Sequence, residues 1–450
     1  MRSLQVLLRR LNHRFDTNSA TSLFYFLLLH MSQNIGLAKC AQGLLVRFAR
    51  KRKNDNLNFA VGLLLYTQRE HALANARFRE VMHFERLTPR ALHLIALSAS
   101  WERDFEILER IALEAGAVKS IASFVRGLIT HVSSPQESIA YFGQVHDLYL
   151  TENAQDHNMA KLPEYVKLSM NVSSYDHQWN ARSIDDGLLN RGETHRLGAK
   201  VPNSKISRIV LMSYTSEYFF SLAEIVITRI RTKHDYAIFL VIVIPNDSTE
   251  VNVQELCIQL SRKFGNIYWQ IMTSNFDLPT LSSIVRFTYA RELFRRNICE
   301  SILIIDADTS FVKVDPIDVW EGIRDKFDIA LLENESLCPW ERMSLGFTIL
   351  NNTNTCMEFL SGFDRYVTRQ FLEKRAYWTL DQTAAHMVLS ELQRGKHNRP
   401  QDEIDVLNLS KVVSLMDFVF TDELIVKRKL RAKATNPEFR TGMDEPLYYD

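Results

Sequence analysis

The spacing of hydrophobic positions changes near the middle of the chain, and the change predicts two kinds of architecture. In the first part, from about residue 57 to residue 150, apolar residues recur every three or four positions, as in Ala91, Leu94 and Ile95, which is the spacing of amphipathic helices. After Lys205 the pattern becomes one of short, unbroken apolar runs. An all-α region is therefore expected to precede a region that contains buried strands.

Four apolar runs in the second part predict strands, and two helical stretches lie among them. The runs are Ile206–Met212, Ala237–Ile244, Ile267–Met272 and Ser301–Ile305, and the helical stretches are Leu222–Ile230 and Leu281–Phe294. Strands that are buried on both faces have continuous Val, Ile and Leu runs, and helices that alternate with them indicate a mainly parallel sheet. The predicted fold class is α/β, and ligands of such sheets bind at the carboxyl ends of the strands.

The helical region weakly resembles tetratricopeptide repeats. A frame of about 34 residues starting at Asp55 places Gly62, Ala74 and Phe78 where that repeat has its small, small and aromatic packing residues. Arrays of such helical hairpins serve as interaction surfaces or packing modules. The predicted organisation is a basic helical segment (1–54), a helical-hairpin domain (55–150), a polar linker (151–204), an α/β domain (205–432) and a tail (433–450).

Composition and charge narrow the possible partners. With 54 Lys and Arg against 53 Asp and Glu, the 450-residue chain has no overall field that would attract nucleic acid, and no nucleic-acid partner is predicted. Residues 1–53 carry ten basic residues and one acid, a local charge of +9. Its longest apolar stretch, Leu23–Leu29, is far shorter than the roughly 20 residues that span a bilayer, so no membrane span is predicted in it. The basic charge fits either peripheral contact with anionic lipid or a solvated helix. Five cysteines without a CxxC motif favour a reducing compartment, so the predicted location is the cytoplasm, with the cytoplasmic membrane face as the alternative.

Two carboxylates one residue apart, Asp306 and Asp308, come directly after the apolar run Ser301–Ile305. Two acids at the end of one buried strand repel and raise each other's pKa unless a cation lies between them. Mg²⁺ or Mn²⁺ would relieve this repulsion, because these ions bind carboxylate oxygens and substrate phosphates. A solvated turn with two acids is the alternative, but the position after a buried strand favours the metal site.

The surroundings of these acids, from Ile304 to Val312, resemble the DxD segment of glycogenin-like (family 8) glycosyltransferases. The resemblance extends over about Arg208–Phe420. It implies a GT-A nucleotide-diphosphosugar transferase fold, a UDP-sugar donor, Mn²⁺ as the preferred metal and transfer with retention of configuration. It also implies that Asp306 and Asp308 are metal ligands and that Ala307 belongs to the donor site.

Further positions match the family in order. The segment after the first apolar run resembles the family's nucleoside-binding turn, which implies that Tyr214, Thr215 and Tyr218 hold the nucleoside and that Tyr218 stacks on the base. A ring that caps the sheet edge is the alternative for Tyr218. Arg291 resembles the family's basic residue that faces the donor, and Arg286 is the alternative. An arginine offers a fixed fork of donors to a phosphate or a carboxylate.

Two later segments resemble the part of the family's site that holds the sugar. Ser344 and Gly346 lie where the family has a strand beneath the sugar, although Ser344 stands where Asn is usual and Leu345 where Ala or Ser is usual. Asp381 and Gln382 resemble an Asp–Gln pair near the anomeric carbon. The resemblance implies that Asp381 binds sugar hydroxyls and that Gln382 lies on the face from which a retaining reaction proceeds. A helix N-cap is the alternative for Asp381.

The family's third metal ligand, a late histidine, is unassigned, with Asp422, His397 or no third ligand as the possibilities. The predicted function is a metal-dependent glycosyltransferase that moves a hexose from a nucleotide-sugar to a saccharide, lipid-linked or protein acceptor. A catalytically impaired nucleotide-sugar-binding scaffold is the alternative, because the late histidine is missing and Ser344 departs from the family. A phosphatase of the haloacid-dehalogenase type also has a DxD after a strand, but three predicted strands precede Asp306, which disfavours it.

Overall fold

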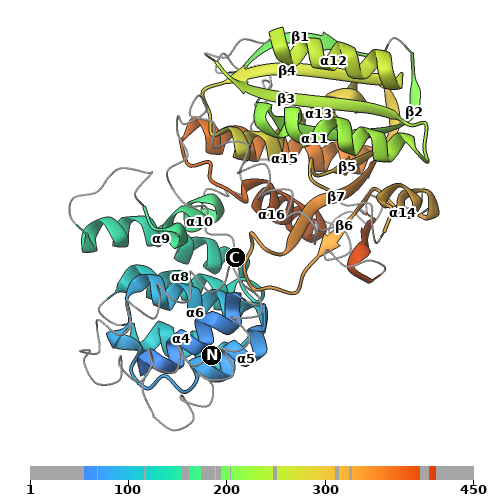
Figure 1. The fold of residues 1–450 in the computed structure, drawn as a ribbon. Helices are drawn as coiled ribbons and strands as arrows, with labels where there is room; N and C mark the ends of the chain where they lie inside the picture. The colour runs from blue at the N-terminus through green and yellow to red at the C-terminus, as the bar shows by residue number, and fades with distance from the viewer. Residues whose placement is uncertain are drawn as a thin grey trace, which may run out of the picture. The chain divides into compact units, whose positions relative to one another are not determined.

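The computed structural model describes residues 55–67, 69–115, 118–153, 162–173, 188, 194–202, 204–246, 251–309, 314–323, 327–395 and 405–411 (Figure 1). Its contacts divide the chain into two compact units. The helical unit ends at Val166 and includes Ser336–Cys338, and the sheet unit begins at Lys167. The predicted basic segment (1–54) and tail (433–450) lie outside the described residues. Within the described ranges, no helix combines the length and the apolar content needed to span a membrane.

The helical unit consists of successive helices joined by short connections, as the three-to-four-residue periodicity predicted. Its helices are α4 (Asp55–Thr67), α5 (His71–Phe78), α6 (Pro89–Trp101), α7 (Phe105–Glu114), α8 (Lys119–Thr130) and α9 (Pro135–Glu152), with a short 3₁₀ turn at Phe84–Arg86; α10 (Glu164–Ser173) follows at the unit's boundary. Helix α6 begins where Thr88 accepts a hydrogen bond from the Ala91 amide at 3.2 Å, directly before a proline. Gly62 of α4 lies against the ring of Phe78, and a Cβ at this position would overlap that ring. The small–aromatic packing expected of these two residues is therefore present.

The sheet unit has eight strands in its described part, in the order β1-β4-β3-β2-β5-β7-β6-β8. Their bounds are β1 (Thr194–Lys200), β2 (Ile206–Thr215), β3 (Ala237–Pro245), β4 (Ile267–Ser274), β5 (Cys299–Ile305), β6 (Ile329–Glu333), β7 (Met343–Asn351) and β8 (Val406–Asn408). Strands β4, β3, β2 and β5 pair in parallel, as do β6 and β8, whereas the other three pairs are antiparallel. The predicted α/β class and the four predicted strands are confirmed.

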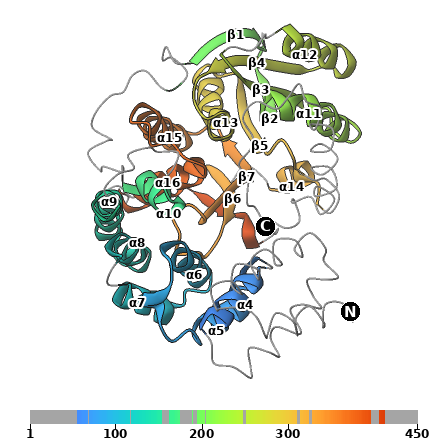
Figure 2. The same ribbon diagram turned by 60° about the vertical axis from the view of Figure 1, so that its left-hand side comes forward.

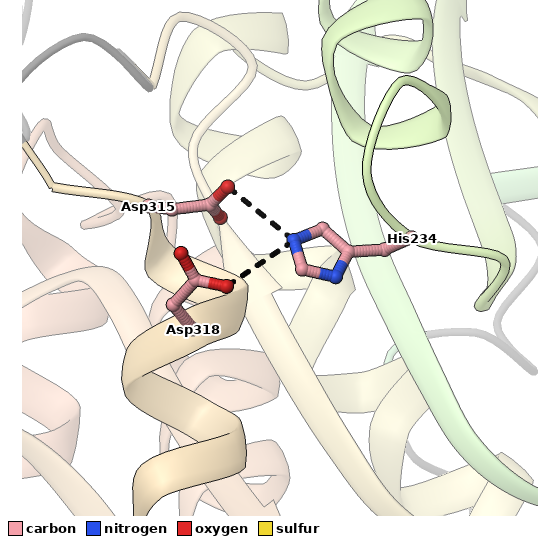
Figure 3. A group of neighbouring side chains, drawn as sticks. All are labelled: His234, Asp315 and Asp318. Atoms are coloured by element: carbon pink, nitrogen blue, oxygen red, sulfur yellow. Dashed lines mark hydrogen bonds and ion pairs between the residues drawn. The ribbon is translucent and has the colours of Figure 1, made fainter.

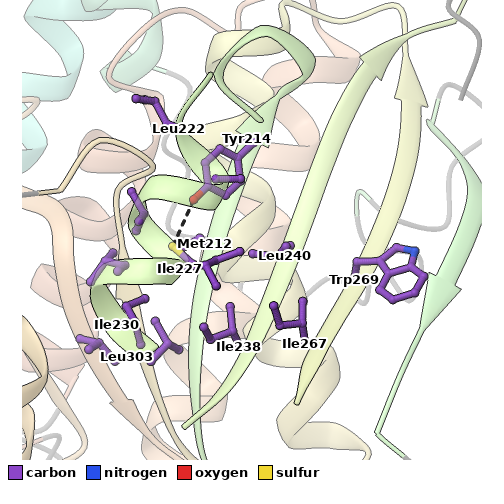
Figure 4. Packing of buried hydrophobic residues seen from close by; sticks show 14 of the residues in the cluster. Met212, Tyr214, Leu222, Ile227, Ile230, Ile238, Leu240, Ile267, Trp269 and Leu303 are labelled. Carbon is purple, nitrogen blue, oxygen red and sulfur yellow. Dashed lines mark hydrogen bonds between the residues drawn. The ribbon is translucent and has the colours of Figure 1, made fainter. Parts of the chain in front are cut away.

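Helices cover both faces of this sheet (Figure 2). They are α11 (Ser216–Arg231), α12 (Val251–Phe264), α13 (Leu278–Arg295), α14 (Pro316–Gly322), α15 (Asn354–Leu372) and α16 (Leu380–Gly395). Successive residues of a strand point to opposite faces of the sheet. Met212 and Tyr214 of β2 pack with α11, α12 and α14 in one apolar cluster on the first face (Figure 4). Ser213, between them, faces the other side and donates a hydrogen bond to the Ser282 carbonyl of α13 at 2.5 Å. Helices α13, α15 and α16 contact one another beyond that second face.

Candidate functional site

Asp306 is the first residue after β5, at the carboxyl end of the parallel strands. The side chain of Ile305 belongs to the apolar cluster on the face of α11 and α14, so the alternation of the strand directs Asp306 to the opposite face. There its Oδ1 accepts a hydrogen bond from the guanidinium of Arg286 on α13. The Asp306 side chain is 46% exposed, so it remains accessible from solvent.

Arg286 joins two acids that are far apart in sequence. Its Nη1 pairs with Asp306, and its Nη2 lies 3.4 Å from Oδ2 of Asp381, in the first turn of α16. The Nε of the same guanidinium donates to the Ser283 carbonyl at 2.9 Å, which fixes its plane. Burial lowers the pKa of the Arg286 guanidinium, but the two carboxylates outweigh this effect and raise the pKa above its usual value. The site therefore contains a permanent, buried positive charge.

Asp381 is the most buried acid of this group, with 4% of its surface exposed. Burial raises the pKa of its carboxyl, and the negative charge of Asp306 adds to that effect. Arg286 and the backbone amide of Gln382 oppose the rise, since both stabilise the ionised form. The net direction is upward, so this carboxylate is held in its ionised form mainly by one guanidinium.

Asp308 lies in the turn after β5 and is partly buried. Its negative charge adds to burial in raising the pKa of Tyr214, which places this carboxylate near the carboxyl end of β2. Strands β2 and β5 are neighbours and run in parallel. The two acids of the predicted metal site thus lie at the carboxyl ends of two adjacent parallel strands, where ligands of α/β sheets bind.

The antiparallel register of β5 and β7, with Ile305 opposite Phe347, brings Gly346 against Asp306, and β7 has a bulge at this point. The pairing of β7 with β6 changes from Leu331↔Thr348 to Leu332↔Ser344, so the residues between them on β7 have no counterpart on β6. The Gly346 carbonyl accepts a hydrogen bond from the Asp306 amide at 2.9 Å. A Cβ at Gly346 would lie 2.9 Å from the Asp306 carboxyl carbon and closer still to one of its oxygens. Only glycine leaves room for this carboxylate, which is a common use of bulges beside functional sites.

Ser344 and Gln382 bind the connection between β6 and β7. The Ser344 hydroxyl accepts a hydrogen bond from Asn334 Nδ2 at 3.2 Å, and the same nitrogen donates to the Glu341 carbonyl at 2.9 Å. With its amide oriented to satisfy its neighbours, Gln382 donates to the main-chain carbonyls of Trp340 and, at 3.2 Å, of Met343. The sequence contained no signal for Asn334, because this contact depends on the bulge that brings Ser344 opposite the end of β6.

Arg291 and Arg286 occupy different faces of α13. The guanidinium of Arg291 donates to Asp364 at 2.7 Å and to Ser361 at 3.2 Å, and both partners are on α15. Five residues of helix rotate a side chain by about 500°, so these two arginines point roughly 140° apart. Arg286, the alternative for the basic residue, is the one that lies beside Asp306.

The predicted nucleoside contacts differ in accessibility. Tyr214 is fully buried, its hydroxyl lies 3.3 Å from the Met212 sulfur, and its ring packs at 68° against that of Phe219 (Figure 4). Its side chain is therefore part of the core. Thr215 is the last residue of β2 and is partly buried, and Tyr218 in the first turn of α11 is 41% exposed. Ala307, between the two acids, packs against the apolar cluster. The candidates for a third metal ligand, Asp422 and His397, lie outside the described residues.

The donor set of Asp306 and Asp308 fits a hard divalent cation. Carboxylate oxygens are the ligands that Mg²⁺ and Mn²⁺ prefer in proteins. One oxygen of Asp306 is engaged by Arg286, and the other lies beside Gly346, which has no side chain of its own to cover it. Arg286 balances one of the two negative charges of Asp306 and Asp381, and a divalent cation would neutralise the other.

No protein-family model matches the chain, and no curated protein matches it. Two solved structures share distant similarity with it. One is described as the apo structure of the bifunctional glycosyltransferase WbbM, with 16% identity and a TM-score of 0.33 over 52% of this chain and 46% of that chain. The other is the glycosyltransferase GlyE of Streptococcus pneumoniae TIGR4, with 14% identity and a TM-score of 0.27 over 47% of each chain. The chain thus matches less than half the length of either protein, and similarity at this level carries no argument about activity.

Proposed function

We propose that the chain is a metal-dependent glycosyltransferase that moves a hexose from a nucleotide-diphosphosugar to a saccharide, lipid-linked or protein acceptor. A UDP-sugar is the proposed donor, and Mn²⁺ or Mg²⁺ is the proposed metal. The observation that supports the proposal is the ion-pair arrangement of Asp306, Arg286 and Asp381 at the carboxyl ends of parallel strands, with Asp308 two residues after Asp306 in the turn that follows β5. Ligands of α/β sheets bind at this edge, and paired carboxylates there favour a divalent cation.

Each residue of the site has a separate task in this proposal. Asp306 and Asp308 would hold the metal ion, which when bound neutralises the charge that develops on the leaving nucleoside diphosphate. Arg286 pairs with both Asp306 and Asp381 and would act as a positioning residue that holds the two carboxylates at a fixed distance. Asp381 would accept hydrogen bonds from sugar hydroxyls. Gln382 would support the site by fixing the connection between β6 and β7.

Calorimetric titration of UDP, with and without Mn²⁺ and with GDP as the control, tests this proposal. The expected result is UDP binding that requires Mn²⁺ and that Asp308→Asn abolishes. Asp235→Asn is the matched control, because Asp235 is 85% exposed and lies near the amino end of β3. Retained metal-dependent binding in Asp308→Asn would overturn the site. Assays of UDP-sugar hydrolysis then separate the two functions, since UDP binding without turnover of any UDP-hexose would replace the transferase with the nucleotide-sugar-binding scaffold.

A further inference from the structure

A group of side chains of the types that bind metal ions lies at the amino-terminal end of the parallel strands, the end opposite to Asp306 (Figure 3). His234 is in the turn that precedes β3, and Asp315 and Asp318 are at the start of α14. Because β3 begins at Ala237, this group is at the amino end of the parallel strands, whereas Asp306 follows the carboxyl end of β5. The group is therefore separate from the proposed donor site.

The distances in this group are longer than those of typical charged hydrogen bonds. His234 Nε2 lies 3.3 Å from Asp315 Oδ2 and 3.6 Å from Asp318 Oδ1. Hydrogen bonds between a charged imidazole and a carboxylate typically measure about 2.7–2.9 Å, and one N–H shared between two oxygens binds each of them more weakly. Ligands about 2.1 Å from a tetrahedral ion are about 3.4 Å from one another, which matches both distances. One ligand atom from each of the three residues lies within 4.8 Å of the other two.

The surroundings orient the imidazole and one carboxylate toward this point. The His234 side chain is 9% exposed, and its Nδ1 lies 3.9 Å from Glu321 Oε1, which accepts the Tyr236 hydroxyl at 2.5 Å. Glu321 lies on the Nδ1 side of the ring, where its carboxylate would accept the imidazole proton once a metal ion occupies Nε2. Asp315 Oδ1 accepts the Ile317 amide at 3.0 Å, and its Oδ2 faces His234.

Lys233 occupies part of the same space. Its Nζ is 3.1 Å from Asp315 Oδ2 and 3.9 Å from Asp318 Oδ2. The Lys233 side chain is 57% exposed, so the ammonium group can turn into solvent when a stronger cation arrives. A divalent ion would thus replace a monovalent charge, and removal of the lysine should strengthen metal binding.

We propose that His234, Asp315 and Asp318 bind a divalent transition-metal ion, with Zn²⁺ as the best match. A neutral imidazole and two carboxylates balance the charge of Zn²⁺, and three protein ligands leave the fourth tetrahedral position to water. The ion would tie the turn between α11 and β3 to the start of α14. This site does not depend on the proposed transferase activity.

The test is a spectroscopic titration of the full-length chain with Co²⁺, a probe for Zn²⁺ sites, followed by displacement with Zn²⁺. The wild-type chain should show a ligand-field band that His234→Ala and Asp318→Asn abolish. Glu321→Gln should weaken binding about 10-fold through loss of the partner of the imidazole, and Lys233→Met should tighten it. His146→Ala is the matched control and should leave the band unchanged, because His146 faces a single carboxylate, that of Asp147 at 3.3 Å.

Two further measurements keep the result decisive. Asp318 is 60% exposed, so Asp318→Asn is expected to fold even if His234→Ala does not. The titration is repeated in Asp308→Asn, where an unchanged band shows that the two sites are independent whether or not the donor site exists. Equal Co²⁺ binding by the wild-type chain and Asp318→Asn would overturn the proposal, as would weaker binding by Lys233→Met. The group would then be an ion-pair network without a metal.

Discussion

Replacing Arg286 by methionine should destabilise the sheet unit in a way that depends on pH. Asp306 is 46% exposed and can turn toward water, but Asp381 is 4% exposed and would remain buried without a cation. Removing one partner of a buried ion pair costs about 3–5 kcal/mol, because the other charge is left uncompensated. With only one of the two acids trapped in this way, we expect a loss near the lower end, about 3 kcal/mol at pH 8.

The direction of the pH effect follows from the pKa of Asp381. Burial already raises this pKa in the folded chain, and Arg286 is the largest influence that lowers it. In Arg286→Met the folded state therefore holds a proton on Asp381 that the unfolded chain releases. A raised pKa of a carboxyl means that stability falls as pH rises above its unfolded value. The deficit of the variant should thus be smaller at pH 5 than at pH 8.

The assay is urea unfolding of the full chain at pH 5 and pH 8, followed by circular dichroism. The double variant Arg286→Met/Asp381→Asn provides the control, because it removes both charges and should recover most of the lost stability. Equal losses at the two pH values, together with no recovery in the double variant, would show that Arg286 contributes through packing alone. In that case the account of the site as a charge network would be wrong.

Three other changes test separate parts of the structure. Burial lowers the pKa of His93 to about 3, so below pH 6.5 the unfolded chain binds a proton that the folded chain does not. The free energy of unfolding should therefore fall by about 2 kcal/mol between pH 7 and pH 5. His93→Leu should remove this part of the pH dependence in urea unfolding. Gly346→Ala should displace Asp306 and weaken Mn²⁺-dependent UDP binding about 10-fold or more in calorimetry, whereas unchanged affinity would remove Gly346 from the site. Arg291→Met should remove the guanidinium that pairs with Asp364, whose side chain is 4% exposed, and lower the free energy of unfolding in urea by about 3 kcal/mol. The affinity of the folded protein for UDP should stay the same. A loss of that affinity would show that Arg291 contributes to the donor site.

The strands and the position of Asp306 and Asp308 were predictable because their signals are local. An apolar run such as Ala237–Ile244 can be satisfied only by burial on both faces, and all of its residues are buried in β3. A polar pair directly after Ser301–Ile305 must then lie at the carboxyl end of that strand. Both inferences use only neighbours in the sequence, so they hold whatever the rest of the chain does.

The partner of Asp306 was not predictable in the same way. Arg286 and Arg291 lie on one helix and differ only in the direction that each faces. That direction is set by α15 and α16, which begin more than 60 residues later, at Asn354 and Leu380. The resemblance to a short motif around Arg291 contains no information about these helices. The structure distinguishes the two arginines because it shows which face of α13 meets Asp381.

The charges of Asp306 and Asp381, at the carboxyl ends of the strands, are compatible with both a buried arginine and the proposed divalent metal ion. When ionised, Asp306 and Asp381 carry two negative charges, and Arg286 supplies one positive charge, so this group of three side chains retains a charge of −1. Burial raises the pKa of Asp381, and the negative charge of Asp306 adds to that effect. Arg286 stabilises ionised Asp381, which solvent hardly reaches, and pairs with one oxygen of Asp306, whose side chain is 46% exposed. The proposed divalent cation would add positive charge on the exposed side of Asp306 without displacing the buried arginine, so the two cations would be complementary.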